Sequence, residues 1–272
     1  MKYLRNAYLI LIFGILYIPI LTLILFSFNE SNSTAVFTGF SFKWYVELFN
    51  SPETFTALRN TLILAISSSL IATVIGTAAA EGIYKMRSKL MKGAVTSVTN
   101  IPMMNPDIVT GMSMMLFFVA VAAILGVSYE NMGFTAMLIS HTTFCLPYVI
   151  LSVLPRINEL GDSLSEAALD LGCTPLQAFF KVKLPNIMPG VLSGAVMAFT
   201  MSLDDFVISY FVGSSNFQTL PLLIYSMTKK KVTPDMYALS TLIVVTVFVL
   251  LIISNLRSGR KLEGERKRGK TK

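Results

Sequence analysis

Charged residues are scarce in this sequence. Asp, Glu, Lys and Arg make up only 14% of the 272 residues, whereas hydrophobic residues make up 54%, and the mean hydropathy is +0.66. A soluble domain of this length does not need so much apolar surface, so the composition argues against a soluble protein. It predicts an all-α, polytopic membrane protein.

Cysteine and histidine are also rare. The two cysteines, Cys145 and Cys173, offer neither a disulfide framework nor the spacing of metal ligands. No nucleophile–base constellation is present, so we expect no catalytic residue and no metal site. The single histidine, His141, lies in an apolar run, where a hydrogen-bonded interior histidine is the commoner outcome.

Six apolar runs are long enough to cross a hydrocarbon core of roughly 30 Å as helices. They cover residues 7–28, 61–82, 108–126, 132–154, 187–212 and 236–256. The first has no cleavage site after it, so it predicts an uncleaved anchor. The sequence therefore predicts one six-helix membrane domain over residues 1–256, followed by a basic tail at 257–272.

The distribution of basic residues predicts the orientation. With the N-terminus in the cytoplasm, most of the 22 Lys and Arg residues fall on the inner side, as the positive-inside rule expects. Both termini are then cytoplasmic. Much of the net charge of +7 lies in the tail, which indicates a solvated end that can touch anionic lipid, and no nucleic-acid site.

A long segment between the first two spans, residues 29–60, is rich in aromatic residues. We expect it to form a short helix on the outer membrane interface, where aromatic rings form a belt. Trp44 then has two interpretations, a belt residue or a residue facing the substrate path.

A polar cassette at residues 156–186 separates the fourth and fifth apolar runs and faces the cytoplasm in this orientation. Ser163 and Glu166 have the spacing of a capping box, and Gly172 fits the residue after a helix end. Thr174-Pro175 can start a second helix, which Leu184-Pro185 should end. The prediction is a stiff elbow whose exposed front consists of Ala167, Ala168, Leu171 and Leu176; the alternative is a loop folded back on its own bundle.

The cassette carries a family motif. Glu166-Ala167-Ala168 is followed after three residues by Gly172 and, nine residues later, by Val182-x-Leu184-Pro185. This resembles the EAA loop of ABC-importer permeases, with Val182 where isoleucine is usual. In that family the loop is a coupling helix that docks on an ATPase subunit. The resemblance implies a type I ABC importer (MetI-like) permease fold in a bacterial inner membrane.

Other stretches narrow the resemblance to the permeases of spermidine/putrescine importers. They are Ser27-Phe28-Asn29, residues 106–109, residues 140–147, Ser202-Leu203-Asp204-Asp205, residues 220–222 and residues 224–227. This implies a second, homologous permease subunit, a pair of ATPase subunits and an extracytoplasmic polyamine-binding protein as partners.

Carboxylates inside apolar runs, together with the neighbouring Ser202, are the candidate substrate contacts. Asp204 and Asp205 stand in the fifth run, where a charge at the bilayer centre costs roughly 2.5–3.5 kcal/mol. Adjacent helical residues point about 100° apart, so at most one of the two can face a narrow path squarely, and the other can bond Ser202, Ser209 or a neighbouring helix. Asp107 is a further candidate, either as a helix cap or as a substrate contact. For Glu81, pairing with Lys85 is favoured.

The tail contains a literal phosphate-loop pattern, Gly264-x-x-x-x-Gly269-Lys270-Thr271. A phosphate loop needs a strand before it and a helix after it, and here neither fits. We therefore expect no bound cofactor, with ATP and Mg²⁺ held by the partner ATPase. Alternatives are a permease for another solute, such as an organophosphonate or a metal ion, and an ATP-independent channel or scaffold.

Overall fold

The computed structural model describes residues 2–31, 36–214, 216–230, 236–242, 244–246 and 248–249. Within these ranges the chain is helical and contains no strand, only two isolated bridges, Asn29 with Phe40 and Ser214 with Phe217. This confirms the predicted all-α class.

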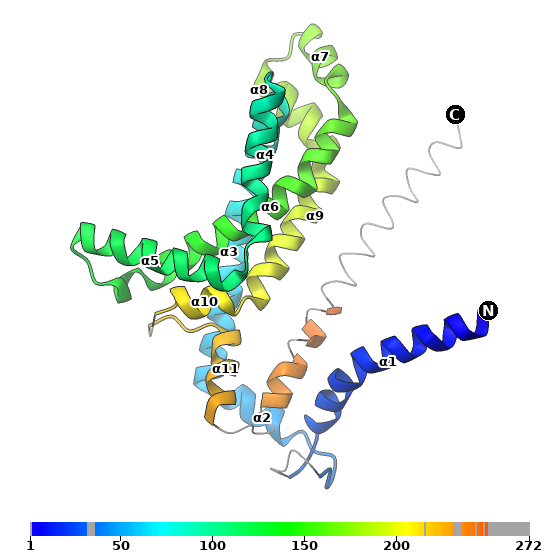
Figure 1. Cartoon of the computed structure of the whole chain (residues 1–272), viewed down its shortest axis with the longest axis vertical. Coiled ribbons are helices and arrows are strands. Elements are labelled where there is room, and N and C mark those ends of the chain that lie inside the picture. The colour runs from blue at the N-terminus through cyan, green and yellow to red at the C-terminus, as the bar shows by residue number, and fades with distance from the viewer. Residues whose placement is uncertain are drawn as a thin grey trace. The chain divides into compact units, whose positions relative to one another are not determined.

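Figure 1 shows the arrangement of the helices. In chain order they are α1 Lys2–Phe26, α2 Lys43–Asn50, α3 Pro52–Lys85, α4 Lys89–Met104, α5 Asp107–Leu125, the 3₁₀ turn η1 Tyr129–Met132, α6 Gly133–Leu160, α7 Ser163–Asp170, α8 Pro175–Ala178, the π turn η2 Phe179–Lys183, α9 Leu184–Asp204, α10 Val207–Val212 and α11 Leu220–Lys230.

Among the residues that the structure describes, five helical segments have the length and hydropathy to cross a membrane. They cover Tyr8–Phe26, Pro52–Lys85, Asp107–Leu125, Tyr129–Leu160 and Pro175–Asp204. These segments confirm the first five predicted spans as apolar helices. The sixth, 236–256, lies largely outside the described residues, which include the start of an apolar helix at residue 236. The basic tail and its phosphate-loop pattern lie wholly outside them.

The fifth predicted span needs a correction. It was expected to run without a break over 187–212, but α9 ends at Asp204 and α10 begins only at Val207. Asp205 has an extended backbone, with φ −63° and ψ 123°. The helix stops here because the Asp205 carboxylate binds the free N–H groups at the start of α10, as described below.

The chain divides into two compact units, residues 59–219 and residues 1–58 with 220–272. The boundary falls inside the predicted domain 1–256, and that domain assignment stays a prediction. In the 59–219 unit, α6 and α9 run alongside each other, with α7 and α8 at one end of the pair and α10 at the other (Figure 1).

Close packing of α6 on α9 requires glycine on α9. A Cβ atom added at Gly190 would lie 2.8 Å from the carbonyl oxygen of Ser152, and one at Gly194 would lie 3.1 Å from the Cα of Val149. Both are shorter than ordinary contact. The two backbones can therefore approach only because these side chains are absent, and α6 supplies the largest share of the buried core of this unit.

The other unit contains the predicted short helix after the first span, which is α2. Trp44 is 5% exposed, and its indole N–H donates a hydrogen bond of 2.6 Å to the carbonyl of Asn29. A small apolar core joins α2, the start of α3 and α11; it consists of Leu48, Ala57, Leu220, Leu223 and Leu239.

Candidate functional site

The break between α9 and α10 is held by the Asp205 side chain. Its two carboxylate oxygens accept hydrogen bonds from the backbone N–H groups of Ile208, at 3.2 Å, and Ser209, at 2.8 Å. The first N–H groups of a helix have no partner within the helix, so a carboxylate placed here satisfies them and interacts favourably with the helix dipole. The side chain is 7% exposed. Asp205 is thus largely a buried structural group in this unit.

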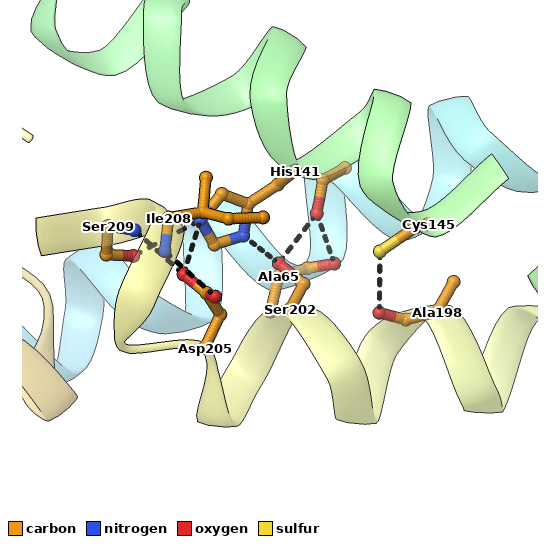
Figure 2. A network of polar contacts seen from close by, with 9 residues as sticks. Ala65, His141, Cys145, Ala198, Ser202, Asp205, Ile208 and Ser209 are labelled. Carbon is orange, nitrogen blue, oxygen red and sulfur yellow. Dashed lines mark hydrogen bonds and ion pairs between the residues drawn. The ribbon is translucent and has the colours of Figure 1, made fainter. Parts of the chain in front are cut away.

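His141 of α6 faces this carboxylate from the opposite side (Figure 2). Its Nε2 atom lies 3.4 Å from the Asp205 carboxylate and 3.2 Å from the hydroxyl of Ser209, and its Nδ1 atom lies 2.8 Å from the hydroxyl of Ser202. The ring is buried. Every ring nitrogen has a partner, which confirms the predicted hydrogen-bonded interior histidine.

Ser202 extends the polar network to a third helix. Its hydroxyl accepts a hydrogen bond of 2.9 Å from the hydroxyl of Ser68 on α3. The network therefore ties α3, α6, α9 and the start of α10 together inside an apolar bundle. A buried polar group needs such partners to avoid a cost of about 1–3 kcal/mol. Ser68 was missed from the sequence, although three consecutive serines within the second apolar run were a signal for it.

Asp204 differs from its neighbour. It is the last residue of α9 and is exposed, whereas Asp205 and Ser202 belong to the buried network. Asp205 bonds the N–H of Ser209, one of the partners expected for the acid that does not face the path. That Asp204 faces a substrate path stays a prediction.

Asp107 and Trp44 are not brought into this network. Asp107 is the first residue of α5, is exposed, and follows Pro106 at the cap position, so it does not occupy the cap position itself. Trp44 is buried in the other unit. Their contacts with substrate stay predictions.

The cassette folds into two short helices, α7 and α8, as predicted. Gly172 has φ +87°, and the Cys173 and Gly172 N–H groups donate to the carbonyls of Ala168 and Leu169 at 3.0 and 2.9 Å. This bond pair defines a Schellman motif, which confirms Gly172 as the residue after the helix end. Glycine suits it because a left-handed backbone strains any residue with a Cβ.

The second helix of the cassette also begins as predicted. Thr174 accepts a hydrogen bond from the N–H of Gln177, and the Gln177 side chain accepts one from the N–H of Thr174, at 3.3 and 3.1 Å. This is a capping box with Pro175 at the first helical position. The turn between α7 and α8 is therefore locally fixed by backbone and capping bonds.

Three details of the cassette were predicted wrongly. Ser163 is not a cap: the turn at Gly161 places Asp162 there, and the N–H of Glu166 donates to the carbonyl of Asp162. Ala168 is not exposed but 7% accessible, because α7 packs against η2.

The third error concerns Leu184-Pro185, which does not end the second helix. The N–H of Leu184 donates to the carbonyl of Phe179, five residues back, so a π turn leads directly into α9. Pro185 then lies in the first turn of α9, where its missing N–H costs nothing. Of the predicted exposed front, Ala167, Leu171 and Leu176 are exposed, with Leu171 86% and Leu176 72% exposed, and Glu166 is exposed beside them.

An ion-pair cluster lies where η2 meets α3. Glu81 pairs with Lys85 at 3.1 Å, as predicted, and also with Lys183 at 2.9 Å. Lys183 is only 3% exposed. The sequence gave no sign of the second pair, because its members are separated by 102 residues.

Helices with these lengths and apolar surfaces are those of a multi-pass membrane protein. Residues 72–260 match the family described as "Binding-protein-dependent transport system inner membrane component". The match covers more than half of the chain, so the protein belongs to this family of inner-membrane transport components.

Individual relatives agree with the family. The chain is 38% identical over 254 residues to the spermidine/putrescine transport system permease protein PotC of Haemophilus influenzae, covering 93% of this chain and 96% of that protein. It is also 38% identical over 250 residues to the putrescine transport system permease protein PotI of Escherichia coli K12, covering 92% and 89%.

A solved structure confirms the predicted ABC-importer permease fold. A chain of a bacterial ABC transporter involved in the import of the acidic polysaccharide alginate superposes with a TM-score of 0.76 at 19% identity, covering 95% of this chain and 96% of that one. At this identity the likeness establishes the fold and says nothing about which substrate this chain transports.

Proposed function

We propose that this chain is the permease subunit of an ATP-driven importer that carries polyamines such as spermidine and putrescine into the cell. The observation that carries the proposal is a sequence identity of 38%, over more than nine tenths of the chain, to two relatives named for the transport of these compounds. It distinguishes the proposal from the alternatives of another solute and of an ATP-independent channel.

The chemistry of Asp204 supports a cationic cargo. A polyamine is a flexible polycation with methylene segments between its ammonium groups. An exposed carboxylate at the end of a membrane helix attracts such a cation by Coulomb interaction, most strongly where water is partly excluded. The same carboxylate repels anionic cargo, which disfavours an organophosphonate.

The proposed assembly supplies what this chain lacks. A second, homologous permease subunit completes the path, an extracytoplasmic polyamine-binding protein delivers the substrate, and two ATPase subunits bind ATP and Mg²⁺. The chain itself binds no cofactor and catalyses no reaction. Both termini lie in the cytoplasm, so the cassette faces the ATPases there.

The cassette is the proposed point of contact with an ATPase. Glu166 and Ala167 are exposed on α7, and the apolar side chains of Leu171 and Leu176 project into solvent in the isolated chain. Exposed leucines beside a rigid turn suit insertion into a cleft of another protein. Movement of the ATPases on binding ATP then shifts the cassette and, through α9, the end of the path at Asp204.

Uptake in a cell that lacks its own polyamine system tests this function. The complete importer should accumulate labelled spermidine or putrescine, and unlabelled polyamine should compete. Asp204→Asn should lower uptake at least about tenfold, the factor that corresponds to 1.4 kcal/mol. Glu53→Gln is the matched control, since Glu53 is an exposed carboxylate on α3 that lies outside the cassette and outside the Ser202–Asp205 segment. Equal uptake by both variants would remove Asp204 from the path.

A further inference from the structure

Lys183 is a charged residue in an interior position, at the junction between the cassette and α9. It is 3% exposed, and its Nζ atom lies 2.9 Å from both carboxylate oxygens of Glu81 on α3. The same atom lies 4.5 Å from the centre of the Tyr84 ring. A lysine buried this far from water stays charged only when such partners replace its hydration. The pair is therefore a specific contact and differs from a solvated surface ion pair.

Lys85 provides the contrast. It also contacts Glu81, at 3.1 Å, but it is 67% exposed and lies one turn away on the same helix. An exposed ion pair within one helix contributes little to stability, and it connects only residues that the helix already holds together. Only the contact of Lys183 connects two separate elements, α3 and η2.

The place of Lys183 in the chain gives this connection its significance. It is the last residue of η2, and the next residue, Leu184, begins α9. The backbone ladder changes here from the π to the α pattern, and such bulges in helices often occur at functional sites. From this junction α9 runs for 21 residues to Asp204, a distance on the order of 30 Å at 1.5 Å per residue.

We propose that Glu81 and Lys183 are positioning residues for energy coupling. Their ion pair fastens the π turn to α3, so that displacement of α7 and α8 moves α3 and α9 as one body and does not dissipate by bending at η2. This inference rests on the proposed function of the cassette as the contact with an ATPase. Neither residue touches ATP or the transported cation.

The assay uses the purified complete importer in liposomes with its binding protein and measures polyamine molecules imported per ATP hydrolysed. Glu81→Gln and Lys183→Met should lower this ratio at least about fivefold, the lower end of typical coupling between sites. The ATPase rate should respond less to the loaded binding protein. The exchanged pair Glu81→Lys with Lys183→Glu should recover at least half of the ratio.

Lys85→Met is the matched control, since it removes the other lysine that pairs with the Glu81 carboxylate. Its ratio of polyamine imported to ATP hydrolysed should stay within about twofold of wild type. The double variant Glu81→Leu with Lys183→Met leaves no buried charge unpaired, so it assembles even where a single variant does not. It too should be uncoupled. A normal ratio in the double variant overturns the proposal.

The wild-type complex separates this inference from the function on which it rests. If it imports no polyamine at the expense of ATP, the proposed function fails. If it does so and the double variant matches it, only the role of the Glu81–Lys183 pair fails.

Discussion

The two adjacent aspartates should respond differently to substitution, and the difference can be worked out from their contacts. Asp205→Ala removes the acceptor for two backbone N–H groups, those of Ile208 and Ser209. Loss of a helix-capping side chain costs about 0.5–2 kcal/mol, and a buried donor left without a partner places the cost toward the upper end. Asp204 is exposed, and a surface substitution there changes stability by about 0.5 kcal/mol or less.

Thermal unfolding of the purified importer complex, followed by circular dichroism, measures this difference. The loss of stability from Asp205→Ala should appear as a Tm clearly below that of the wild-type complex. Asp205→Asn keeps an acceptor oxygen, and Asn caps a helix about as well as Asp, so most of the stability should return. Asp204→Asn should unfold with wild-type Tm while losing polyamine uptake.

Two results would refute this reasoning. One is a wild-type Tm for Asp205→Ala, which would mean that the carboxylate does not hold the start of α10. The other is an Asp204→Asn protein destabilised as much as Asp205→Ala, because its loss of uptake would then reflect damage to the fold.

Three further predictions concern other parts of the chain. Glu166→Ala should weaken coupling, seen as a smaller stimulation of ATPase activity by the loaded binding protein; normal stimulation counts against the role of the cassette. Gly190→Ala should destabilise the α6–α9 contact by about 1–3 kcal/mol, because the new Cβ meets the Ser152 carbonyl; an unchanged Tm contradicts it. His141→Ala should lower the Tm, because the hydroxyl of Ser202 then loses one hydrogen-bond partner. His141→Gln should recover part of this loss. Equal Tm values for both variants and wild type would contradict the stabilising role of His141.

Much of the fold could be predicted because the determinants are local. Apolar runs give helices wherever they are long enough, and Gly172 and Thr174-Pro175 fix their turns through bonds to residues only three to five positions away. Prediction failed where the same local sequence pattern is compatible with two backbone structures. Leu184-Pro185 reads as a helix end, but a π turn before it lets the helix continue.

The candidate site was only partly predictable, because its contacts connect distant segments. Ser68 and Ser202 are 134 residues apart, and Glu81 and Lys183 are 102 apart. Two adjacent acids in an apolar run indicated function, but their different roles depend on the helix break, which the apolar pattern of 187–212 conceals. Once the break is known, the division between a buried capping Asp205 and an exposed Asp204 follows from hydrogen bonding.

The central claim is that the chain passes polyamines in a process driven by ATP on its partners. The most direct test is uptake by liposomes that contain the complete purified importer, with ATP sealed inside and binding protein and labelled spermidine or putrescine outside. The account predicts accumulation that requires hydrolysable ATP, is reduced by either unlabelled polyamine, and is lost in Asp204→Asn. Accumulation that continues without ATP, or a wild-type complex that hydrolyses ATP yet takes up neither polyamine, would contradict it.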